Sequence, residues 1–218
     1  MKKIAYLLFA ALIMIAQISC DSKTEEKKES VDDKDKELKE DVKIIADINC
    51  EIEGLTNDIY AFYDKHGESD NALYIFDELG VMFENCTYIT PEEIEALIQQ
   101  NRKVYLEKRG TGTIVERITD KKGNIEYIIK EDQNKITGRL KADTISSELM
   151  AEMTTFVEKF CQKKELLNQS AKIYEEMNNK YKNENVSEKS QKILFDFMTK
   201  CPNFSPERLE EIKKEMNL

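Results

Sequence analysis

The chain has 218 residues, and its 33 Lys and Arg residues against 43 Asp and Glu residues give a formal net charge of −10. A chain this acidic has no electrostatic reason to bind nucleic acid or an anionic membrane surface, so neither is expected as a partner. Seven glycines, three prolines and a high content of Glu and Lys favour helices. Once the N-terminal segments are set aside, about 180 residues remain, enough for a domain with a hydrophobic core.

The N-terminal residues have the order of a secretory signal peptide. Residues 1–3 form a short basic start, residues 4–16 are an apolar run, and small Ser19 precedes Cys20. The apolar run is too short to be read as a membrane-spanning helix. Residues 1–19 are therefore predicted to be a signal that is removed from the mature chain.

The Ser19-Cys20 ending resembles the lipobox of bacterial lipoproteins, although Gln17 stands where that family usually has an apolar residue. The resemblance implies that the signal is cut before Cys20, and that acyl chains on this cysteine, palmitate among them, hold the protein on a membrane. Asp21 and the acidic residues after it resemble signals with which some Bacteroidota export lipoproteins to the cell surface. This implies an outer membrane lipoprotein that faces the periplasm or the outside. The alternatives are an ordinary secretory signal in which Cys20 is not lipidated, and a charged linker that carries no export signal.

A highly charged segment follows, and residues 20–37 are predicted to be a disordered tether. Residues 21–41 carry ten acidic and six basic residues, and their only large apolar residues are Val31 and Leu38. Such a segment buries too little apolar surface to offset its ordering entropy. A flexible chain of about 18 residues would hold the domain roughly 20–25 Å from a membrane.

The first predicted helical repeat covers residues 38–109. Apolar residues recur at helical spacing on both sides of the polar break DKHGESD at residues 64–70, which predicts a helix, a loop and a second helix. A third helix is expected to begin after Thr90, whose hydroxyl is placed to cap it, with Glu93 completing a capping box. Ser205 occupies the same place before a later helix.

Part of this repeat returns near the C-terminus. The stretch CTYITPEEIEAL at residues 86–97 corresponds to CPNFSPERLEEI at residues 201–212, with four identical and four conservative positions. Placing Cys50 opposite Cys161 extends the similarity backwards, and the intercysteine separations of 36 and 40 residues differ by one short insertion. The chain is therefore predicted to contain an internal duplication.

Residues 110–145 differ from both repeats and are predicted to be a β-rich connector that leads to the second repeat at residues 146–218. Clusters of β-branched residues, such as 113–115 and 128–129, flank a DKKGN turn around Gly123. A small antiparallel meander of two or three strands is expected there, with a short helix as the alternative. The predicted fold class is mainly α, with two helical hairpins, each followed by a capped third helix, joined by this meander.

Four cysteines, Cys50, Cys86, Cys161 and Cys201, lie in the part of the chain that is expected to fold after export, where disulfides are common. In an antiparallel helical hairpin, residues equally far from the turn lie opposite one another. The midpoint of each intercysteine segment falls in a polar loop, which predicts the bridges Cys50–Cys86 and Cys161–Cys201, each stapling one hairpin. Four free buried cysteines are the alternative.

No residue pattern points to catalysis, to a metal site or to a cofactor, so an enzyme is not expected. The single histidine, His66, falls in a polar break beside acidic residues and is predicted to be solvated, and the cysteines lack the spacing of a zinc site. Carboxylates are too frequent for any pair to indicate acid–base chemistry. The tyrosines of the first repeat suit a half-buried core or a binding face; they are Tyr60, Tyr63, Tyr74 and Tyr88.

Three functions remain open. The favoured one is a membrane-anchored envelope module that binds a protein or another envelope partner without catalysis, its ligand undetermined. The second is an inhibitor or immunity lipoprotein, whose negative charge would steer it to a basic enzyme or toxin. The third is a hydrolase whose carboxylates the sequence does not identify.

Overall fold

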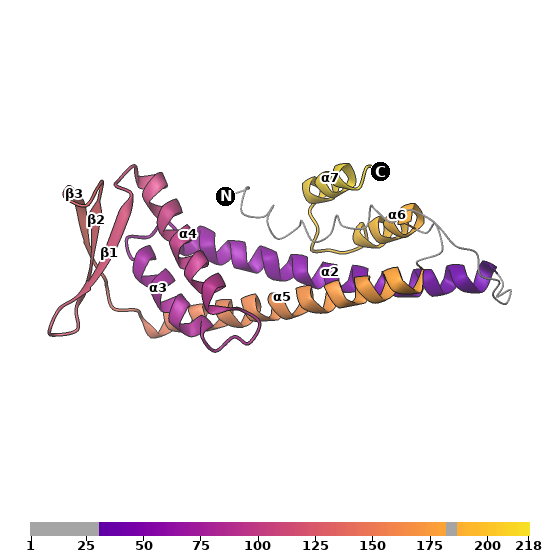
Figure 1. Ribbon diagram of the computed structural model, residues 1–218, viewed down its shortest axis with the longest axis horizontal. Coiled ribbons are helices and arrows are strands. Elements are labelled where there is room, and N and C mark those ends of the chain that lie inside the picture. The colour runs from indigo at the N-terminus through magenta and orange to yellow at the C-terminus, as the bar shows by residue number, and fades with distance from the viewer. Residues whose placement is uncertain (1–30, 182–186) are drawn as a thin grey trace. The chain divides into compact units, whose positions relative to one another are not determined.

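The computed structural model describes residues 31–181 and 187–218, and within them the chain is mainly helical (Figure 1). A small sheet interrupts the helices, and two disulfides cross-link the chain. The predicted fold class, mainly α with a small β segment, is confirmed at this level. In chain order the elements are α2 (Val31–His66), α3 (Ala72–Phe83), α4 (Pro91–Arg109), β1 (Ile114–Thr119), β2 (Ile125–Lys130), β3 (Ile136–Lys141), α5 (Ser147–Lys180), α6 (Ser187–Met198) and α7 (Pro206–Glu215).

The chain divides into two compact units. Among the described residues, unit 1 contains those up to Gly54 and those from Leu166 onwards, and unit 2 contains Leu55 to Glu165. The long helices α2 and α5 each contribute one part to unit 1 and the other part to unit 2. Unit 1 also contains α6 and α7, whereas unit 2 contains α3, α4 and the sheet.

Unit 1 packs two short helices on segments of α2 and α5. The Lys180 ammonium lies 2.8 Å from the Glu37 carboxylate and 2.7 Å from that of Asp41, so the end of α5 lies beside the beginning of α2. Apolar residues at helical spacing on α2 turn inwards, and residues of α6 and α7 complete the core. The buried residues are Leu38, Val42, Ile45, Ala46, Met177, Tyr181, Leu194, Met198, Phe204 and Ile212.

Helix α2 begins inside the segment that the sequence predicts to be a tether. Residues 31–37 are helical, whereas residues 20–30 of that segment, like the predicted signal peptide, lie outside the described residues. The Leu38 side chain is almost fully buried, and Asp35 forms an ion pair with Lys189 of α6. The charges of residues 34–37 are compatible with a helix because these side chains are exposed or partly exposed, whereas the apolar stripe that begins at Leu38 is buried.

Unit 2 has an aromatic core in which residues of α2, α3 and α5 meet. The centroid of the Phe156 ring lies 4.3 Å from that of Phe62 and 5.5 Å from that of Tyr63, and the centroids of Phe83 and Phe160 are 5.0 Å apart. Aromatic pairs of this kind add about 0.5–1.5 kcal/mol beyond the area that they bury. The core extends to α4 through Tyr105 and to the sheet through Tyr127 and Ile129. Further buried residues on α3 and α5 complete it, namely Leu73, Phe76, Leu79 and Met153.

The connector forms the antiparallel meander that the sequence predicts, with three strands in the order β1-β2-β3. The turn between β1 and β2 contains Gly123 at φ 85°, a left-handed conformation that residues with side chains rarely adopt. β1 pairs with β2 over its whole length. In β3, Thr137 is an extra residue relative to β2, so that this edge strand carries a bulge.

Both predicted helix caps are confirmed. The Thr90 hydroxyl accepts a hydrogen bond from the Glu93 main-chain N–H at 3.2 Å, and the Glu93 carboxylate accepts one from the Thr90 N–H at 3.0 Å, which completes the capping box of α4. At the start of α7, the Ser205 hydroxyl accepts from the Arg208 N–H at 3.2 Å. A proline follows each cap, where its missing N–H has no cost.

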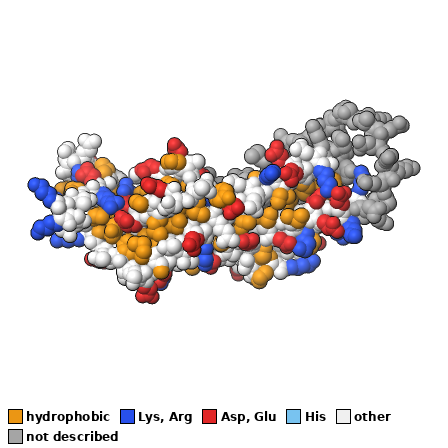
Figure 2. Space-filling model, turned by 90° about the horizontal axis from the view of Figure 1, so that it is seen from below, with side chains coloured by type: hydrophobic (Ala, Val, Ile, Leu, Met, Phe, Trp, Pro, Cys, Tyr) orange, Lys and Arg blue, Asp and Glu red, His pale blue; other side chains and the backbone are white. Residues whose placement is uncertain are grey.

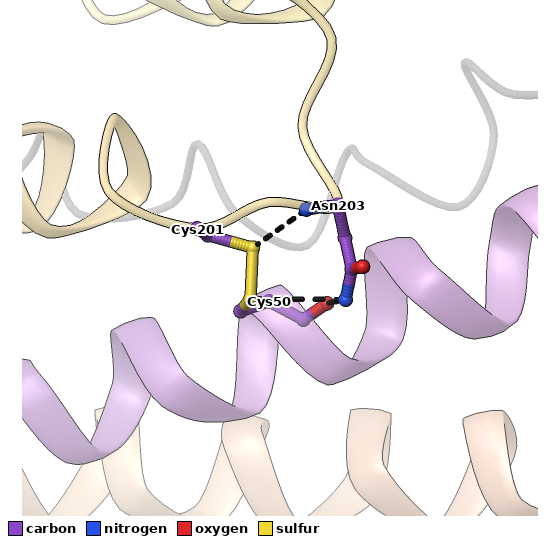
Figure 3. The surroundings of a disulfide bond; sticks show 3 residues. All are labelled: Cys50, Cys201 and Asn203. Atoms are coloured by element: carbon purple, nitrogen blue, oxygen red, sulfur yellow. Dashed lines mark hydrogen bonds between the residues drawn. A yellow bond between two sulfur atoms is a disulfide. The ribbon is translucent and has the colours of Figure 1, made fainter.

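The four cysteines of the folded region form disulfides, as expected, but the predicted pairing is wrong. Cys50 is bonded to Cys201 within unit 1, and Cys86 is bonded to Cys161 within unit 2, with Cα–Cα distances of 5.8 and 5.9 Å. Beside the first bridge, the Asn203 side-chain amide donates a hydrogen bond to the Cys50 carbonyl at 2.8 Å (Figure 3).

The predicted pairing fails because it treats each hairpin as an isolated pair of helices. Helix α2 has 36 residues, and its residues on the two sides of Gly54 belong to different units. Cys50 therefore meets the segment between α6 and α7 in unit 1, whereas Cys86, which follows α3, meets α5 in unit 2. Each bridge thus joins the end of a short helix to a long helix from the other half of the chain.

Candidate functional site

A groove of about 510 Å³ lies in unit 2 between α4 and the start of β1. Its lining on β1 and the residues just before it is Gly112 to Val115, and no residue of β2 or β3 belongs to the lining. The groove therefore follows the side of β1 that faces away from β2. On α4 the lining residues are three or four positions apart and form one stripe of the helix, made of Gln99, Arg102, Lys103, Leu106 and Glu107.

β1 is an edge strand, and its free edge borders the groove. The Asp120 N–H donates a hydrogen bond to the Asn124 carbonyl at 2.9 Å, so these two residues are a hydrogen-bonded pair at the end of the β1–β2 ladder. Counting back along β1 from Asp120, successive residues point their main-chain N–H and C=O groups alternately away from β2 and toward it. By that alternation the main-chain groups of Val115, Arg117 and Thr119 point away from β2. None of the described strands pairs with β1 on that side.

A buried carboxylate behind the groove joins the sheet to α3 and α4. The side chain of Asp77 on α3 is 4 % exposed and accepts hydrogen bonds from the Arg102 guanidinium and the Tyr127 hydroxyl, both at 2.9 Å. Arg117 of β1 adds an ion pair with Asp77 at 3.6 Å. Burial and the Asp77 carboxylate raise the pKa of Tyr127 well above its usual range, so its hydroxyl stays a donor. This cluster fixes both walls of the groove, since Arg102 belongs to one wall and Arg117 to the strand that forms the other.

Two buried polar groups at the groove have no hydrogen-bond partner within the described residues. They are the Nε–H of Arg102, which lines the groove, and the hydroxyl of Thr111, which precedes the lining residue Gly112. Leaving a buried group of this kind unpaired costs about 1–3 kcal/mol.

The sheet is a locally basic region of an acidic chain. Residues 114–141 contain seven Lys or Arg and five Asp or Glu residues, although the whole chain has a net charge of −10. Figure 2 shows Lys and Arg side chains gathered at the end of unit 2 where the sheet lies. In the groove itself, Arg102 is paired with the buried Asp77, and Lys103 is the exposed cation of the lining, 3.9 Å from Glu107. The local charge therefore favours a ligand that carries negative charge.

His66 is the last residue of α2 and is largely buried, so the prediction of a solvated loop residue is wrong. Its side chain is 13 % exposed, its ring centroid lies 4.6 Å from that of Phe62, and its Nε2 lies 2.8 Å from Oε2 of Glu152 on α5. Hydrogen bonds from Lys65 and His66 hold the pKa of Glu152 below its ordinary value. In the described part of the chain, no group of three or more His, Cys, Asp or Glu residues is placed to hold a metal ion.

The tyrosines of the first repeat differ in burial. Tyr63 packs against the core of unit 2, its hydroxyl accepts a hydrogen bond from the Asn101 amide at 3.5 Å, and burial raises its pKa to about 12. Tyr74 packs against the same core and is partly buried. Tyr88 is exposed, and a hydrogen bond to Glu165 raises its pKa. The interpretation of these residues as core holds for Tyr63 and Tyr74 but not for Tyr88.

The anchoring cysteine, Cys20, lies outside the described residues, so its lipidation stays a prediction. None of the described helices is both long enough and apolar enough to cross a membrane. Comparison of the chain with protein-family models, with curated proteins and with solved structures finds no match.

The sequence interpretation missed both the groove and Asp77. A signal for Asp77 exists, because it is the first carboxylate in the otherwise apolar stretch ALYIFDELGVMF of α3 and shares the buried face with Leu73 and Phe76. The groove has no comparable signal, since it depends on how β1 lies beside α4.

Proposed function

We propose that the protein is an envelope lipoprotein, anchored to the outer membrane through Cys20, that binds a partner protein without catalysing a reaction. The resemblance of its N-terminal residues to a lipoprotein signal supports the anchor, and the charged residues that follow suit a tether. The observation that carries the binding role is the groove beside β1, which combines a free strand edge with a basic helix stripe. Such a surface offers main-chain hydrogen bonds and charge to a protein partner.

The groups around the groove support binding more than catalysis. The Arg102 guanidinium is held by Asp77, and the Lys103 ammonium lies 3.9 Å from the Glu107 carboxylate at the surface. The one histidine, His66, is paired with a carboxylate and is not among the lining residues. Paired, positioned charges of this kind suit recognition of a complementary surface.

We also propose that the chain contains a duplication in which α2–α3–α4 corresponds to α5–α6–α7. The first two helices match in length, with 36 against 34 residues and 12 against 12 residues. The two disulfides are also equivalent. In the sequence alignment Cys50 corresponds to Cys161 and Cys86 to Cys201, so exchanging the repeats turns one bridge into the other.

An ion pair beside each disulfide supports the same correspondence. Arg208 of α7 lies 3.9 Å from Glu53 of α2, and Glu93 of α4 lies 2.7 Å from Lys164 of α5. The cysteine alignment has offsets of 111 residues (161 − 50) and 115 residues (201 − 86). With these offsets Arg208 corresponds to Glu93 and Glu53 to Lys164, so the contact is kept while the two charges are exchanged. A chance similarity between helical sequences would have no reason to retain such a pair.

Metabolic labelling with an alkyne analogue of palmitate tests the anchor. The full chain, produced in a bacterium that processes lipoproteins, should be labelled and recovered with the membranes. The variant Cys20→Ala should lose the label, whereas the control Ser22→Ala should keep it. A membrane-bound and normally processed Cys20→Ala protein would refute the lipoprotein proposal.

Cross-linking in whole cells tests the binding role. A photoreactive residue in place of Lys103, whose side chain is 75 % exposed at the groove, should trap the same protein in repeated experiments. The same residue in place of Lys192, which is exposed on α6 of unit 1, is the matched control and should not trap that protein. If no exposed position gives a specific adduct under several growth conditions, the binding role is contradicted.

A further inference from the structure

We infer that the groove beside β1 binds an extended, acidic segment of the partner protein, which pairs with β1 as a fourth strand of the sheet. This inference rests on the proposed binding function and names its mode. In strand addition, main-chain hydrogen bonds supply the affinity, and the surroundings of alternate side chains supply the specificity.

The free edge of β1 is the first support. The main-chain N–H and C=O groups of Val115, Arg117 and Thr119 point away from β2, and an added strand would pair with them. The groove provides room along the beginning of that edge, because its volume of about 510 Å³ lies in the range of typical binding sites, about 300–1,000 Å³.

The two edges of the sheet differ in how far they discourage a further strand. β3 carries the bulge at Thr137, followed by Gly138, Arg139 and Lys141. Bulges and basic residues are devices by which proteins protect sheet edges from pairing. β1 pairs regularly with β2 over six residues and has no bulge, and its one basic residue, Arg117, is paired with Asp77. The unprotected edge is therefore the one beside the groove.

The charges at the groove select an acidic occupant. Arg102 and Lys103 line it together, and Arg117 lies in the middle of β1. The Arg102 and Arg117 guanidinium groups are already paired with the Asp77 carboxylate. The Lys103 side chain is 75 % exposed, and its ammonium lies 3.9 Å from the Glu107 carboxylate. A carboxylate on the added strand would meet Lys103 in a region that is basic relative to the rest of the chain.

A second copy of this chain is a poorer occupant. In an antiparallel pair of β1 strands centred on the outward-pointing residue in the middle, Arg117 would lie opposite Arg117. Like charges directly opposite each other destabilise a strand pair. Two chains that each carry a net charge of −10 also repel one another.

Two matched synthetic peptides test the inference on the full chain in detergent micelles. The probe is a nine-residue peptide of alternating Thr and Val with Glu at two positions. Its partner has the same side chains but carries N-methyl groups on alternate residues, so that one edge cannot donate hydrogen bonds. The unmodified probe should bind about tenfold or more tightly than the methylated one, as expected for the loss of about two hydrogen bonds. On binding, amide hydrogen exchange at Val115, Arg117 and Thr119 should slow.

Charge variants complete the test. Lys103→Glu should weaken binding of the acidic probe several-fold, and should strengthen binding of a version of the probe with Lys in place of Glu. Lys122→Glu, in the turn between β1 and β2 and outside the groove, is the control and should leave both affinities unchanged.

Several outcomes would overturn the inference. One is equal binding of the methylated and unmethylated probes, and another is protection of β3 amides in place of those of β1. Dimerisation of the free chain with protection of Val115, Arg117 and Thr119 would show that the strand edge binds a second copy of the chain and not an acidic peptide. If the probe does not bind while a cross-linker at Lys103 still traps a partner in cells, strand addition is wrong and the proposed function stands.

Discussion

Removal of either disulfide should destabilise the protein by a similar amount, although the bridges span different lengths of chain. Cys50–Cys201 has a sequence separation of 151 residues, and Cys86–Cys161, of 75 residues, lies wholly inside it. When the inner bridge is intact, the shortest covalent path from Cys50 to Cys201 passes through that bridge and leaves out the residues between Cys86 and Cys161. The outer bridge then closes an effective loop of only about 76 residues, 36 before the inner bridge and 40 after it.

The loop lengths give the size of the effect. In the chain-entropy model a loop of about 75 residues corresponds to about 4.5 kcal/mol at 25 °C, which the outer bridge contributes while the inner one is present. Removing both should cost about 9 kcal/mol, whichever is removed first. The outer bridge alone closes the full separation of 151 residues and contributes about 5 kcal/mol, so the inner bridge contributes about 4 kcal/mol while the outer one is present.

Urea unfolding of the full chain, followed by circular dichroism, measures these losses. The matched variants are Cys50→Ala with Cys201→Ala, and Cys86→Ala with Cys161→Ala. Each should keep the other bridge and expose no new free thiol, as counted by mass spectrometry after alkylation. The control combines Cys50→Ala with Cys86→Ala and should expose two free thiols. A loss below about 1 kcal/mol in either matched variant would contradict the loop-entropy reasoning, and new thiols in a matched variant would contradict the pairing.

Three further changes test the packing of unit 2. Tyr127→Phe removes a hydroxyl that donates to the buried Asp77 carboxylate, and should cost about 1.5–3 kcal/mol in urea unfolding; an unchanged midpoint would mean that the hydrogen bond adds nothing. Gly112→Ala should lower stability by about 1–3 kcal/mol, because Gly112 has φ 59° and an added Cβ would lie 2.5 Å from the Lys130 carbonyl oxygen; a Tm equal to that of the parent chain argues against strain there. The pKa of Glu152 is lowered by two basic neighbours on α2, so its stabilising effect is present above its ordinary value of 4.5 and is lost as the pH falls below it. Glu152→Gln should therefore show a smaller drop in Tm between about pH 5 and pH 3 than the parent chain, and equal drops would show that this carboxylate is not responsible.

Features that depend on neighbours along the chain could be predicted from the sequence. The capping groups of Thr90 and Ser205 act within one helical turn, so their spacing alone identifies them. The turn at Gly123 is similarly local, because glycine readily adopts a left-handed conformation. β-branched clusters on both sides of that turn were sufficient to place the meander.

Features that depend on distant segments of the chain could not be predicted from the sequence. Whether Cys50 meets Cys86 or Cys201 depends on which helices pack beside α2, and the spacing of apolar residues on one helix does not specify its neighbours. His66 lies in a stretch that looks solvated because the sequence does not show Glu152 of α5 beside it. The groove likewise requires the position of α4 relative to β1, which no local pattern encodes.

The boundary between the two units gives the proposed duplication a physical meaning. Unit 1 takes α2 as far as Gly54, and unit 2 takes α5 as far as Glu165. Each of these residues lies four positions after the cysteine of its long helix, so the boundary falls at corresponding places in the two repeats. Each unit therefore consists of the later part of one repeat and the beginning of the other repeat's long helix.

On the proposed duplication, this composition is that of a domain-swapped dimer joined into one chain. A single ancestral repeat would have completed its core only with the long helix of a second copy, and each disulfide would have linked two chains. Fusion through the connector would make the exchange intramolecular, and would account for bridges that join the repeats and do not staple the hairpins.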